Sequence, residues 1–501
     1  MRVLSQRLDP PEVSLPAAVV FALLIAASLI IALIPLNFAI AVVLGTIALT
    51  LVLVRVDFGI YLTIFAVPFG SLKEIPIGPA SLSVTEFLIP LVFIGWVLKL
   101  IAQRDARVRF TPLFPFLVLF MAVLILSATI SRDLALSTKE LLKWTEFTLL
   151  FLVVANVMTG RRQIAAIVVL LLLATSMEAF HGWYQFLFRK GPDGFLIGGV
   201  FLRAFGTFGQ PNPYAGYLGL TLPLLLGLLV GTRWNLSMRI DRGFVALMTG
   251  TIIILAALLM SFSRGALIAL AIAFAVMLAL RSRQPLVFLL TGILIISVFA
   301  FLAVLGLLPT EATNRLATLA EYFGLFDVTK VVLTPENWAI VERMAYWQSA
   351  WEMFKDHWII GIGIGNFSAY YPEYAYPGWA SGAMGHAHNY YLNLLAETGL
   401  PGFFAYIAFM VAVFIFALRT VARLETTDPP FCRTAPGGWN WFSQPYPLAL
   451  GLMGVLVALS IHNFFDVLYV HGMAVQLGLI LGLLFVLNAI PGEKGARDRT
   501  D

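Results

Sequence analysis

The sequence predicts an all-α polytopic membrane protein with about 12–14 transmembrane helices and one long loop that itself contains helices. Hydrophobic residues make up 60% of the 501 positions and charged residues only 12%, whereas a soluble domain is about 25% charged. Apolar stretches long enough to cross a bilayer follow one another along the chain. The net charge of +5 comes from basic residues scattered between these stretches. That pattern is typical of orientation in a membrane and excludes a nucleic-acid surface.

Fourteen apolar spans account for most of the chain. The third is short, and merged or re-entrant segments would reduce the count to twelve. An even count places both termini on the same side. The predicted spans are 14–34, 37–54, 57–70, 84–101, 112–130, 143–158, 163–187, 213–231, 243–260, 265–280, 285–306, 400–420, 446–466 and 472–490.

The distribution of Lys and Arg predicts the orientation. With the N-terminus inside, 20 of the 32 basic residues fall in inner segments. Of the other 12, four lie in one long loop, where the rule does not apply, so the bias is 20 against 8. Both termini are therefore predicted to be cytoplasmic. The spans of this multi-pass protein are expected to contact membrane lipid. The polar start, Met1 to Pro16, leads into a long apolar stretch, which indicates a first anchor and not a cleaved leader.

An outer loop of 81 residues, 307–387, interrupts the series of spans. Loops of this length are usually functional. Thr334 and Pro335 resemble a helix start, and apolar residues then recur at helical spacing. An amphipathic helix over 336–357 is expected to rest its apolar face on the membrane domain; that face comprises Trp338, Val341, Ala345, Trp351 and Phe354.

These features divide the chain into four parts. We expect N-terminal transmembrane helices over 1–190 and central transmembrane helices with a first outer motif over 191–306. The long loop over 307–387 follows, and then C-terminal transmembrane helices and a cytoplasmic tail over 388–501.

Three arginines at the predicted outer face are candidates for binding an anion. Arg264 sits in a tight turn between two apolar spans, Arg343 lies on the predicted loop helix, and Arg203 precedes a turn in which Asn212 caps the next span. The alternative is structural: snorkelling for Arg264 and a surface pair or Trp stacking for Arg343. As fixed cations at the mouth of a bundle they would suit phosphate.

Two histidines lie where the long loop re-enters the membrane. His388 is a candidate general base, since histidine accepts a proton near neutral pH. The pair His386 and His388 also resembles a metal site, completed by His462 or His471, but carboxylates are sparse nearby and we expect no metal. The single cysteine, Cys432, excludes an internal disulfide, and no CxxC pair exists. The glycines from Gly361 to Gly365 indicate either a plain turn or backbone N–H groups that bind an anion. We expect no cofactor.

Several segments together resemble the O-antigen ligase and polymerase superfamily of bacterial enzymes that handle polyprenyl-diphosphate-linked glycans at the periplasmic face. The resemblance covers about 195–475, and the first 190 residues match only in being hydrophobic. It is carried by Gly209 to Leu218, by Ser261 to Ala266, by Arg343 to Trp347, by Phe354 to Phe367 and by His388 to Gly402.

The resemblance implies a GT-C-like membrane fold and a metal-independent, inverting glycosyl transfer in the bacterial inner membrane. By position, Arg264 and Arg343 would hold the diphosphate of an undecaprenyl-diphosphate donor, with Arg203 as a third cation. His388 would act on the acceptor hydroxyl, and His386 and Asn389, on either side of it, would bind substrate. The catalytic group is thus predicted as His388, Arg264 and Arg343, with a periplasmic active site.

The acceptor separates the alternatives that remain. A ligase would transfer the glycan to lipid A–core, a polymerase to another lipid-linked repeat, and a third kind of enzyme to a protein hydroxyl. A flippase or permease would instead need ionisable residues in mid-membrane. The sequence offers few, since even Glu146 and Glu178 are expected near span ends.

Overall fold

The computed structural model describes residues 36–72, 75–77, 80–104, 107–197, 199–232, 241–281, 327–332, 337–376, 379, 385–427 and 438–490. The predicted spans 14–34 and 285–306 and both chain ends lie outside these residues. Helices dominate what is described, as the sequence predicts.

Two small antiparallel hairpins accompany the helices. One pairs β1 with β2, and the other pairs β3 with β4. The elements are α2 (Leu36–Val54), α3 (Val56–Phe69), η1 (Gly70–Leu72), β1 (Ile75–Ile77), β2 (Ala80–Leu82), α4 (Val84–Gln103), α5 (Phe114–Ala128), α6 (Leu134–Val157), α7 (Arg161–Phe188), η2 (Asp193–Phe195), β3 (Leu196–Ile197), β4 (Phe201–Leu202), α8 (Pro211–Gly219), α9 (Leu222–Gly231), α10 (Arg242–Met260), α11 (Arg264–Arg281), η3 (Val328–Lys330), α15 (Trp338–Asp356), α16 (Phe367–Tyr374), α17 (Tyr390–Thr427), η4 (Gly438–Ser443), α18 (Pro445–His462) and α19 (Met473–Ala489).

Three differences between the helix boundaries and the predicted spans have a local explanation or change the helix count. Helix α6 begins nine residues before the predicted span, because the Asp133 carboxylate accepts hydrogen bonds from Ala135 N and Leu136 N and caps it. The span 213–231 consists of α8 and α9, with Pro223 in the first turn of the second helix. Helix α17 begins ten residues before the predicted span, at Tyr390.

Seven helices in the described residues are long and apolar enough to cross a membrane, and four shorter apolar helices accompany them. Large apolar side chains are exposed along their outer faces. On α10, for example, Val245, Ile252 and Leu259 are 49%, 58% and 52% exposed at intervals of seven residues. Such a stripe suits a surface that faces lipid. The chain is thus an all-α polytopic membrane protein, and the total of 12–14 helices stays a prediction.

Small residues bring the central helices together. A Cβ on Gly227 of α9 would collide with the backbone of Gly451 on α18, so these two helices touch through their glycines. On α19, Gly478 lies against the backbone of Phe147 on α6, and Gly482 lies against the side chain of Val154 on the same helix. Close backbone contact of this kind stabilises helix pairs in lipid, where burial of apolar surface adds little.

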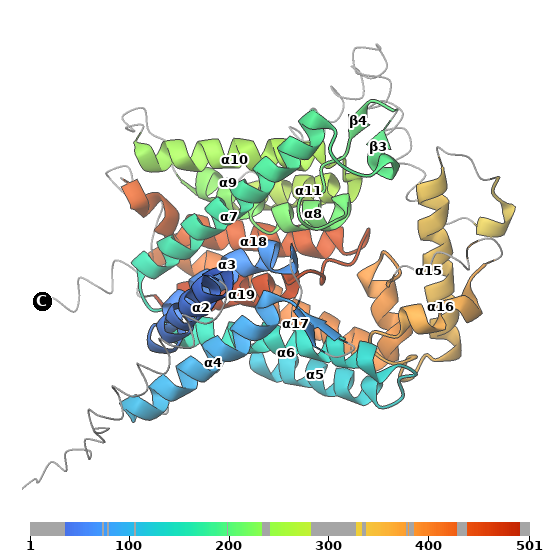
Figure 1. Ribbon diagram of the computed structural model, residues 1–501, viewed down its shortest axis with the longest axis horizontal. Helices are drawn as coiled ribbons and strands as arrows, with labels where there is room; N and C mark the ends of the chain where they lie inside the picture. Colours follow the sequence, from blue (N-terminus) through green and yellow to red (C-terminus); the bar gives the residue numbers. More distant parts are fainter. Residues whose placement is uncertain are drawn as a thin grey trace, which may run out of the picture.

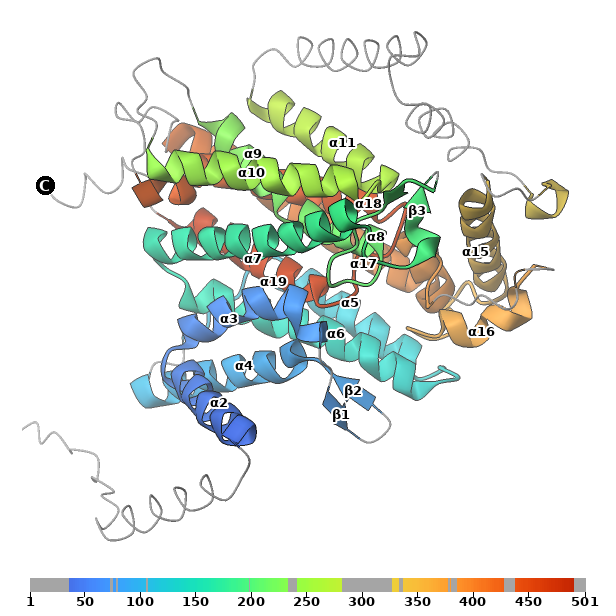
Figure 2. The same cartoon turned by 45° about the horizontal axis from the view of Figure 1, so that its top comes forward.

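The bundle helices run roughly parallel, and α15 crosses one end of the bundle (Figures 1 and 2). Helix α16 and the β3–β4 hairpin lie at the same end. We call it the α15 end. The predicted helix at 336–357 is confirmed as α15, which packs against α16 and α17.

The predicted buried face of α15 was partly wrong. Trp338 and Trp351 are 48% and 46% exposed, whereas Val341 and Ala345 are buried as expected. The helix instead buries a different face against α16 and α17, which lie elsewhere in the sequence, so its own spacing did not reveal that face. The buried residues of α15 are Ile340, Val341, Met344, Ala345, Tyr346, Ser349, Ala350 and Met353.

The glycine segment after α15 is a turn packed on α17. Gly361, Gly363 and Gly365 all have positive φ, and Gly363 N donates to the Glu397 carbonyl over 3.0 Å. The same contact bends α17 at Gly399, where φ is +62° and Leu400 N donates to the Trp358 carbonyl. These glycines therefore join the long loop to the bundle, which favours the plain turn over the anion-binding alternative.

The expectation that Glu146 and Glu178 lie near helix ends was wrong. Glu146 lies in the middle of its helix, because α6 starts earlier than expected, and Glu178 lies well inside α7 (Arg161–Phe188). Glu146 is 5% exposed and Glu178 is fully buried.

Candidate functional site

The three predicted arginines line one pocket at the α15 end. Its volume is about 80 Å³. Arg203 comes from the segment after β4, Arg264 from the start of α11 and Arg343 from α15. Segments far apart in the sequence thus bring three cations to one space. The pocket is lined by Arg203, Asn212, Phe262, Ser263, Arg264, Gly265, Ala339, Arg343, His462 and Phe465.

Arg203 is fixed in place by two neighbouring elements. Its Nε donates to the Ser261 carbonyl over 2.8 Å, and its Nη2 donates to Asn212 Oδ1 over 3.1 Å. The predicted capping role of Asn212 was wrong. Helix α8 begins at Pro211, so Asn212 is inside the first turn and its side chain is available to Arg203.

The segment that carries Arg203 is held by polar groups of α7. Gln185 Oε1 accepts hydrogen bonds from Phe205 N and Gly206 N, and Gln185 Nε2 donates to the Gly206 carbonyl. Glu178 Oε1 accepts one from Thr207 N over 2.5 Å. Gly206 has φ +55°, and a side chain there would collide with Glu178 and Tyr214. Buried polar groups of α7 therefore set the position of this loop.

Arg264 is the first residue of α11 and follows a tight turn. Phe262 in this turn has φ +51°. The next residue, Gly265, lies against the segment after α18: a Cβ there would come within 2.7 Å of Phe465 and 3.2 Å of His462. A side chain at Gly265 would push α11 away from α18, so the glycine keeps Arg264 beside His462.

Helix α15 connects the arginine pocket to His388. One helical turn after Arg343, Trp347 Nε1 donates to the His388 carbonyl over 3.4 Å. The Tyr346 ring lies 5.7 Å from the His388 ring, centroid to centroid. Since residues one turn apart are neighbours on a helix surface, Arg343 and His388 belong to one site.

His388 is 7% exposed and pairs with a carboxylate. Its Nδ1 lies 3.1 Å from Asp466 Oδ1, in the segment between α18 and α19. His388 itself has φ +49°, an uncommon conformation for a residue other than glycine. A carboxylate on Nδ1 fixes the imidazole so that Nε2 is the nitrogen that can accept a proton.

Asp466 stays ionised although it is buried. Burial raises its pKa, but the charge and hydrogen bond of His388 and the charges of His386 and Arg343 outweigh burial and hold this pKa well below its usual range. Asp466 also accepts a hydrogen bond from Val467 N. The ionised carboxylate can stabilise a protonated His388 during a reaction.

His386 stacks beside His388, with ring centroids 4.6 Å apart. Burial, together with the charge of His388, lowers the pKa of His386 to about 4 despite Asp466 nearby. A neutral His386 agrees with its Nδ1 accepting a hydrogen bond from His388 N. Within the described residues, one atom each of His386, His388 and Asp466 lie within 4.8 Å of one another, close enough to hold a cation.

Two residues of the candidate site were not predicted from the sequence in the positions that the structure gives them. Asp466 was not considered, and His462 was considered only as a metal ligand, although it is buried in the wall of the arginine pocket. Asn389, by contrast, was predicted to bind substrate, and its Oδ1 accepts from Tyr391 N and Leu392 N at the start of α17. A polar residue at a helix start is a capping signature that could have identified this role.

Residues 249–407 match the family model described as O-antigen ligase. This segment belongs to the O-antigen ligase superfamily. It contains Arg264, Arg343, His386, His388 and Asn389, whereas Arg203, His462 and Asp466 lie outside it. No curated protein matches the chain.

The match and the apolar helices support a multi-pass membrane enzyme of the O-antigen ligase and polymerase type. A lipid-linked glycan and a glycan acceptor are its partners in general.

Proposed function

We propose that this protein is a membrane glycosyltransferase of the O-antigen ligase type. It transfers a glycan from undecaprenyl diphosphate to an acceptor hydroxyl of lipid A–core, at the periplasmic face of the bacterial inner membrane, with both chain ends in the cytoplasm. The observation that carries the proposal is the meeting of Arg203, Arg264 and Arg343 in one pocket beside the His388–Asp466 pair.

The pocket suits the diphosphate of the donor. Guanidinium groups form charge-assisted, often bidentate hydrogen bonds with phosphate oxygens. Three arginines from separate segments can contact both phosphates from different sides. They also stabilise the negative charge that develops on the diphosphate as it leaves.

The proposed step needs one base and one leaving group. His388 Nε2 takes the proton of the acceptor hydroxyl as its oxygen attacks the anomeric carbon. The bond from that carbon to the diphosphate oxygen breaks, and undecaprenyl diphosphate leaves with the electron pair. Attack from the face opposite the leaving group inverts the anomeric centre. The energy comes from the donor, and the arginines supply the positive charge that a metal would otherwise provide.

Transfer by the purified protein in detergent tests this function. At normal protein levels, we expect His388→Ala to abolish transfer from an undecaprenyl-diphosphate glycan and Arg264→Ala to reduce it by at least about tenfold. Arg419→Ala is the matched control, since Arg419 is exposed on α17 outside this pocket. Activity near wild type in either site variant would remove that residue from the mechanism.

A deletion strain separates the possible acceptors. Loss of polymer from lipid A with lipid-linked polymer accumulating means a ligase. Accumulation of single lipid-linked repeats means a polymerase, and loss of glycan from a protein means a protein glycosyltransferase.

A flippase for lipid-linked glycan is the alternative from another class. Glu146 favours it, because a buried carboxylate inside a helix is the feature that transport would require. Transfer without translocation in proteoliposomes would exclude it, and translocation without transfer would exclude the glycosyltransferase.

A further inference from the structure

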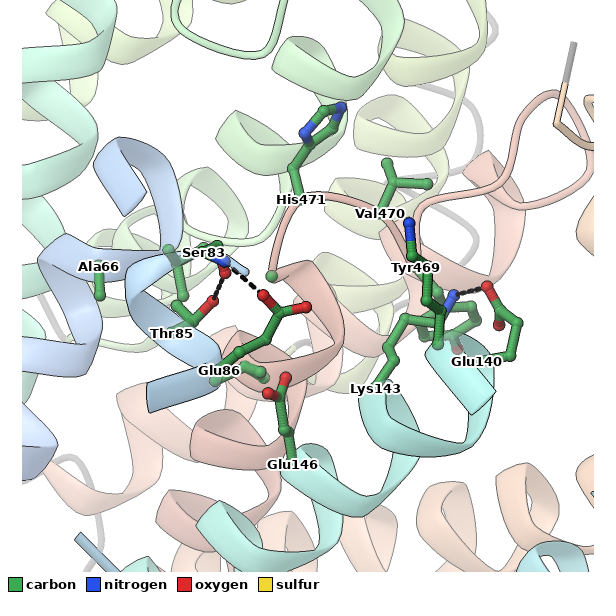
Figure 3. Close-up of a pocket in the computed structure, with 14 residues that line it drawn as sticks. Ala66, Ser83, Thr85, Glu86, Glu140, Lys143, Glu146, Tyr469, Val470 and His471 are labelled. Atoms are coloured by element: carbon green, nitrogen blue, oxygen red, sulfur yellow. Dashed lines mark hydrogen bonds and ion pairs between the residues drawn. The ribbon is translucent and has the colours of Figure 1, made fainter. Parts of the chain in front are cut away.

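A second, larger cavity lies away from the arginine pocket. Its volume is about 430 Å³, within the ~300–1,000 Å³ range of small-molecule sites. It is bounded by the end of α3, the first turns of α4, the first half of α6 and the segment before α19 (Figure 3). None of its described lining residues falls in 249–407.

The lining of this cavity is polar and carries both charges. Glu86 accepts a hydrogen bond from Ser83 N, and Lys143 pairs with Glu140 over 2.6 Å. Figure 3 shows the carboxylates of Glu86 and Glu146 turned towards the same space. The hydroxyls of Ser83 and Thr85 and the exposed Lys139 complete a set of hydrogen-bond donors and acceptors.

Glu146 is the residue that points to a ligand. It is only 5% exposed, and its Oε1 is buried without a hydrogen-bond partner among the described residues. A buried carboxylate oxygen without a partner is costly, and such groups in native proteins call for an explanation. A bound molecule with hydroxyl groups would supply the missing donor.

The cluster of His386, His388 and Asp466 lies near both this cavity and the arginine pocket. Tyr469 lines the cavity, three residues after Asp466, and its ring lies 4.6 Å from that of Tyr390, which follows His388 by two residues. The charges of Lys143, from the cavity, and of Arg343, from the arginine pocket, both act on His386, whose low pKa is due chiefly to burial. A transferase needs its base between the donor and the acceptor.

We propose that this cavity binds the sugar of the acceptor, with Glu146 and Lys139 as ligands of its hydroxyl groups. The proposal rests on the proposed function. A sugar ring presents hydroxyls that donate to carboxylates and accept from ammonium groups, which matches this lining. A diphosphate matches it less well, because the carboxylates of Glu86 and Glu140 would repel it.

Steady-state kinetics of the purified full chain test the proposal. The probes are an undecaprenyl-diphosphate glycan as donor and, as acceptor, either lipid A–core or a lipid-linked repeat unit. We expect Glu146→Gln to raise the KM for the acceptor at least tenfold, with the donor KM and the kcat at saturating acceptor within twofold of wild type. Lys139→Ala is the second variant, because an exposed side chain can be removed without unfolding the protein. Glu352→Gln is the matched control, an exposed carboxylate on α15.

The outcomes separate this proposal from the proposed function. A raised acceptor KM supports it, and the acceptor that shows the effect identifies the source of the sugar. Transfer with an unchanged acceptor KM in both variants overturns the proposal and leaves the function intact. Transfer to a protein hydroxyl alone overturns both the proposal and the proposed function. If wild type transfers to neither acceptor, the proposed function fails. Binding of lipid A–core then decides: loss of binding in Glu146→Gln supports the cavity, and no binding by wild type overturns it.

Discussion

His388 and Asp466 are 78 positions apart and form a buried pair, with Nδ1 of the histidine 3.1 Å from Oδ1 of the aspartate. The pair depends on the contact between α17 and the segment after α18, where Tyr390 N donates to the Asn463 carbonyl over 2.8 Å. This crossing places a carboxylate behind the candidate base, while the arginine pocket lies beside it.

Asp466→Asn tests whether the carboxylate orients His388. The amide keeps the shape but loses the charge that fixes Nδ1–H and stabilises a protonated ring. We expect kcat to fall by about 10²-fold, within the range for acid–base catalysis, with the donor KM unchanged. The variant is compared with wild type in folding and in transfer kinetics. An unchanged kcat would show that His388 does not need Asp466.

The arginine pocket predicts an effect on the donor. Replacing Arg203, Arg264 or Arg343 with Met removes charge-assisted hydrogen bonds of about 1.5–3 kcal/mol each. We expect kcat/KM for the donor to fall roughly tenfold to 100-fold per arginine. Lysine variants should lie between wild type and the methionine variants, because lysine keeps the charge but cannot form the bidentate hydrogen bonds of a guanidinium. Equal falls in kcat/KM for the donor and for the acceptor would argue against a diphosphate site.

The segment after β4 that carries Arg203 is held by α7, so a substitution on α7 is predicted to weaken donor binding. Gln185→Leu removes three hydrogen bonds to the backbone of Phe205 and Gly206. We expect the donor KM to rise as it does when Arg203 itself is replaced, because the arginine loses its support. Tyr184→Phe is the control, since Tyr184 is 49% exposed. Loss of stability with an unchanged donor KM would mean that the hydrogen bonds from Gln185 stabilise the fold but do not position Arg203 for the donor.

The sequence was informative where single charges interrupt apolar spans. Arg203, Arg264 and Arg343 stood out because a lone cation at a membrane boundary is costly, and the structure brings all three to one pocket. Asp466 could not be found in this way, since its role exists only through its contact with His388. The acceptor cavity was also missed, because the polar residues of α4 and α6 form no motif along the chain. The spans were predictable from hydropathy, but the bend at Gly399 depends on a partner segment.

The bend in α17 predicts a graded series of glycine variants. At Gly399, φ is +62° and a Cβ would come within 2.7 Å of the Ile359 and Trp358 backbone. We expect Gly399→Ala to lower the free energy of unfolding by about 1–3 kcal/mol through backbone strain, with the collision adding to this loss. Gly199→Ala measures the backbone strain alone, since Gly199 has φ +68° but open space around a Cβ. Gly194→Ala is the second control, because Gly194 has neither a positive φ nor a close neighbour. Thermal unfolding in detergent should therefore rank Gly399→Ala lowest, and equal unfolding temperatures would contradict the account.

The cluster of His386, His388 and Asp466 predicts inhibition by zinc in the metal-independent transferase that we propose. Its three ligand atoms lie within 4.8 Å of one another, and a small closure would bring them to the distances that zinc prefers. We expect a chelator alone to leave transfer unchanged, because arginines hold the diphosphate and Asp466 orients the base. Added zinc should inhibit, because it would occupy His388, and a chelator should restore the activity. With each variant's activity without zinc taken as its reference, His386→Gln should need a higher zinc concentration for inhibition than wild type. His357→Gln, outside the cluster, should need the same concentration as wild type. Loss of transfer with the chelator alone, restored by a divalent ion, would instead assign the cluster to a metal that takes part in the reaction.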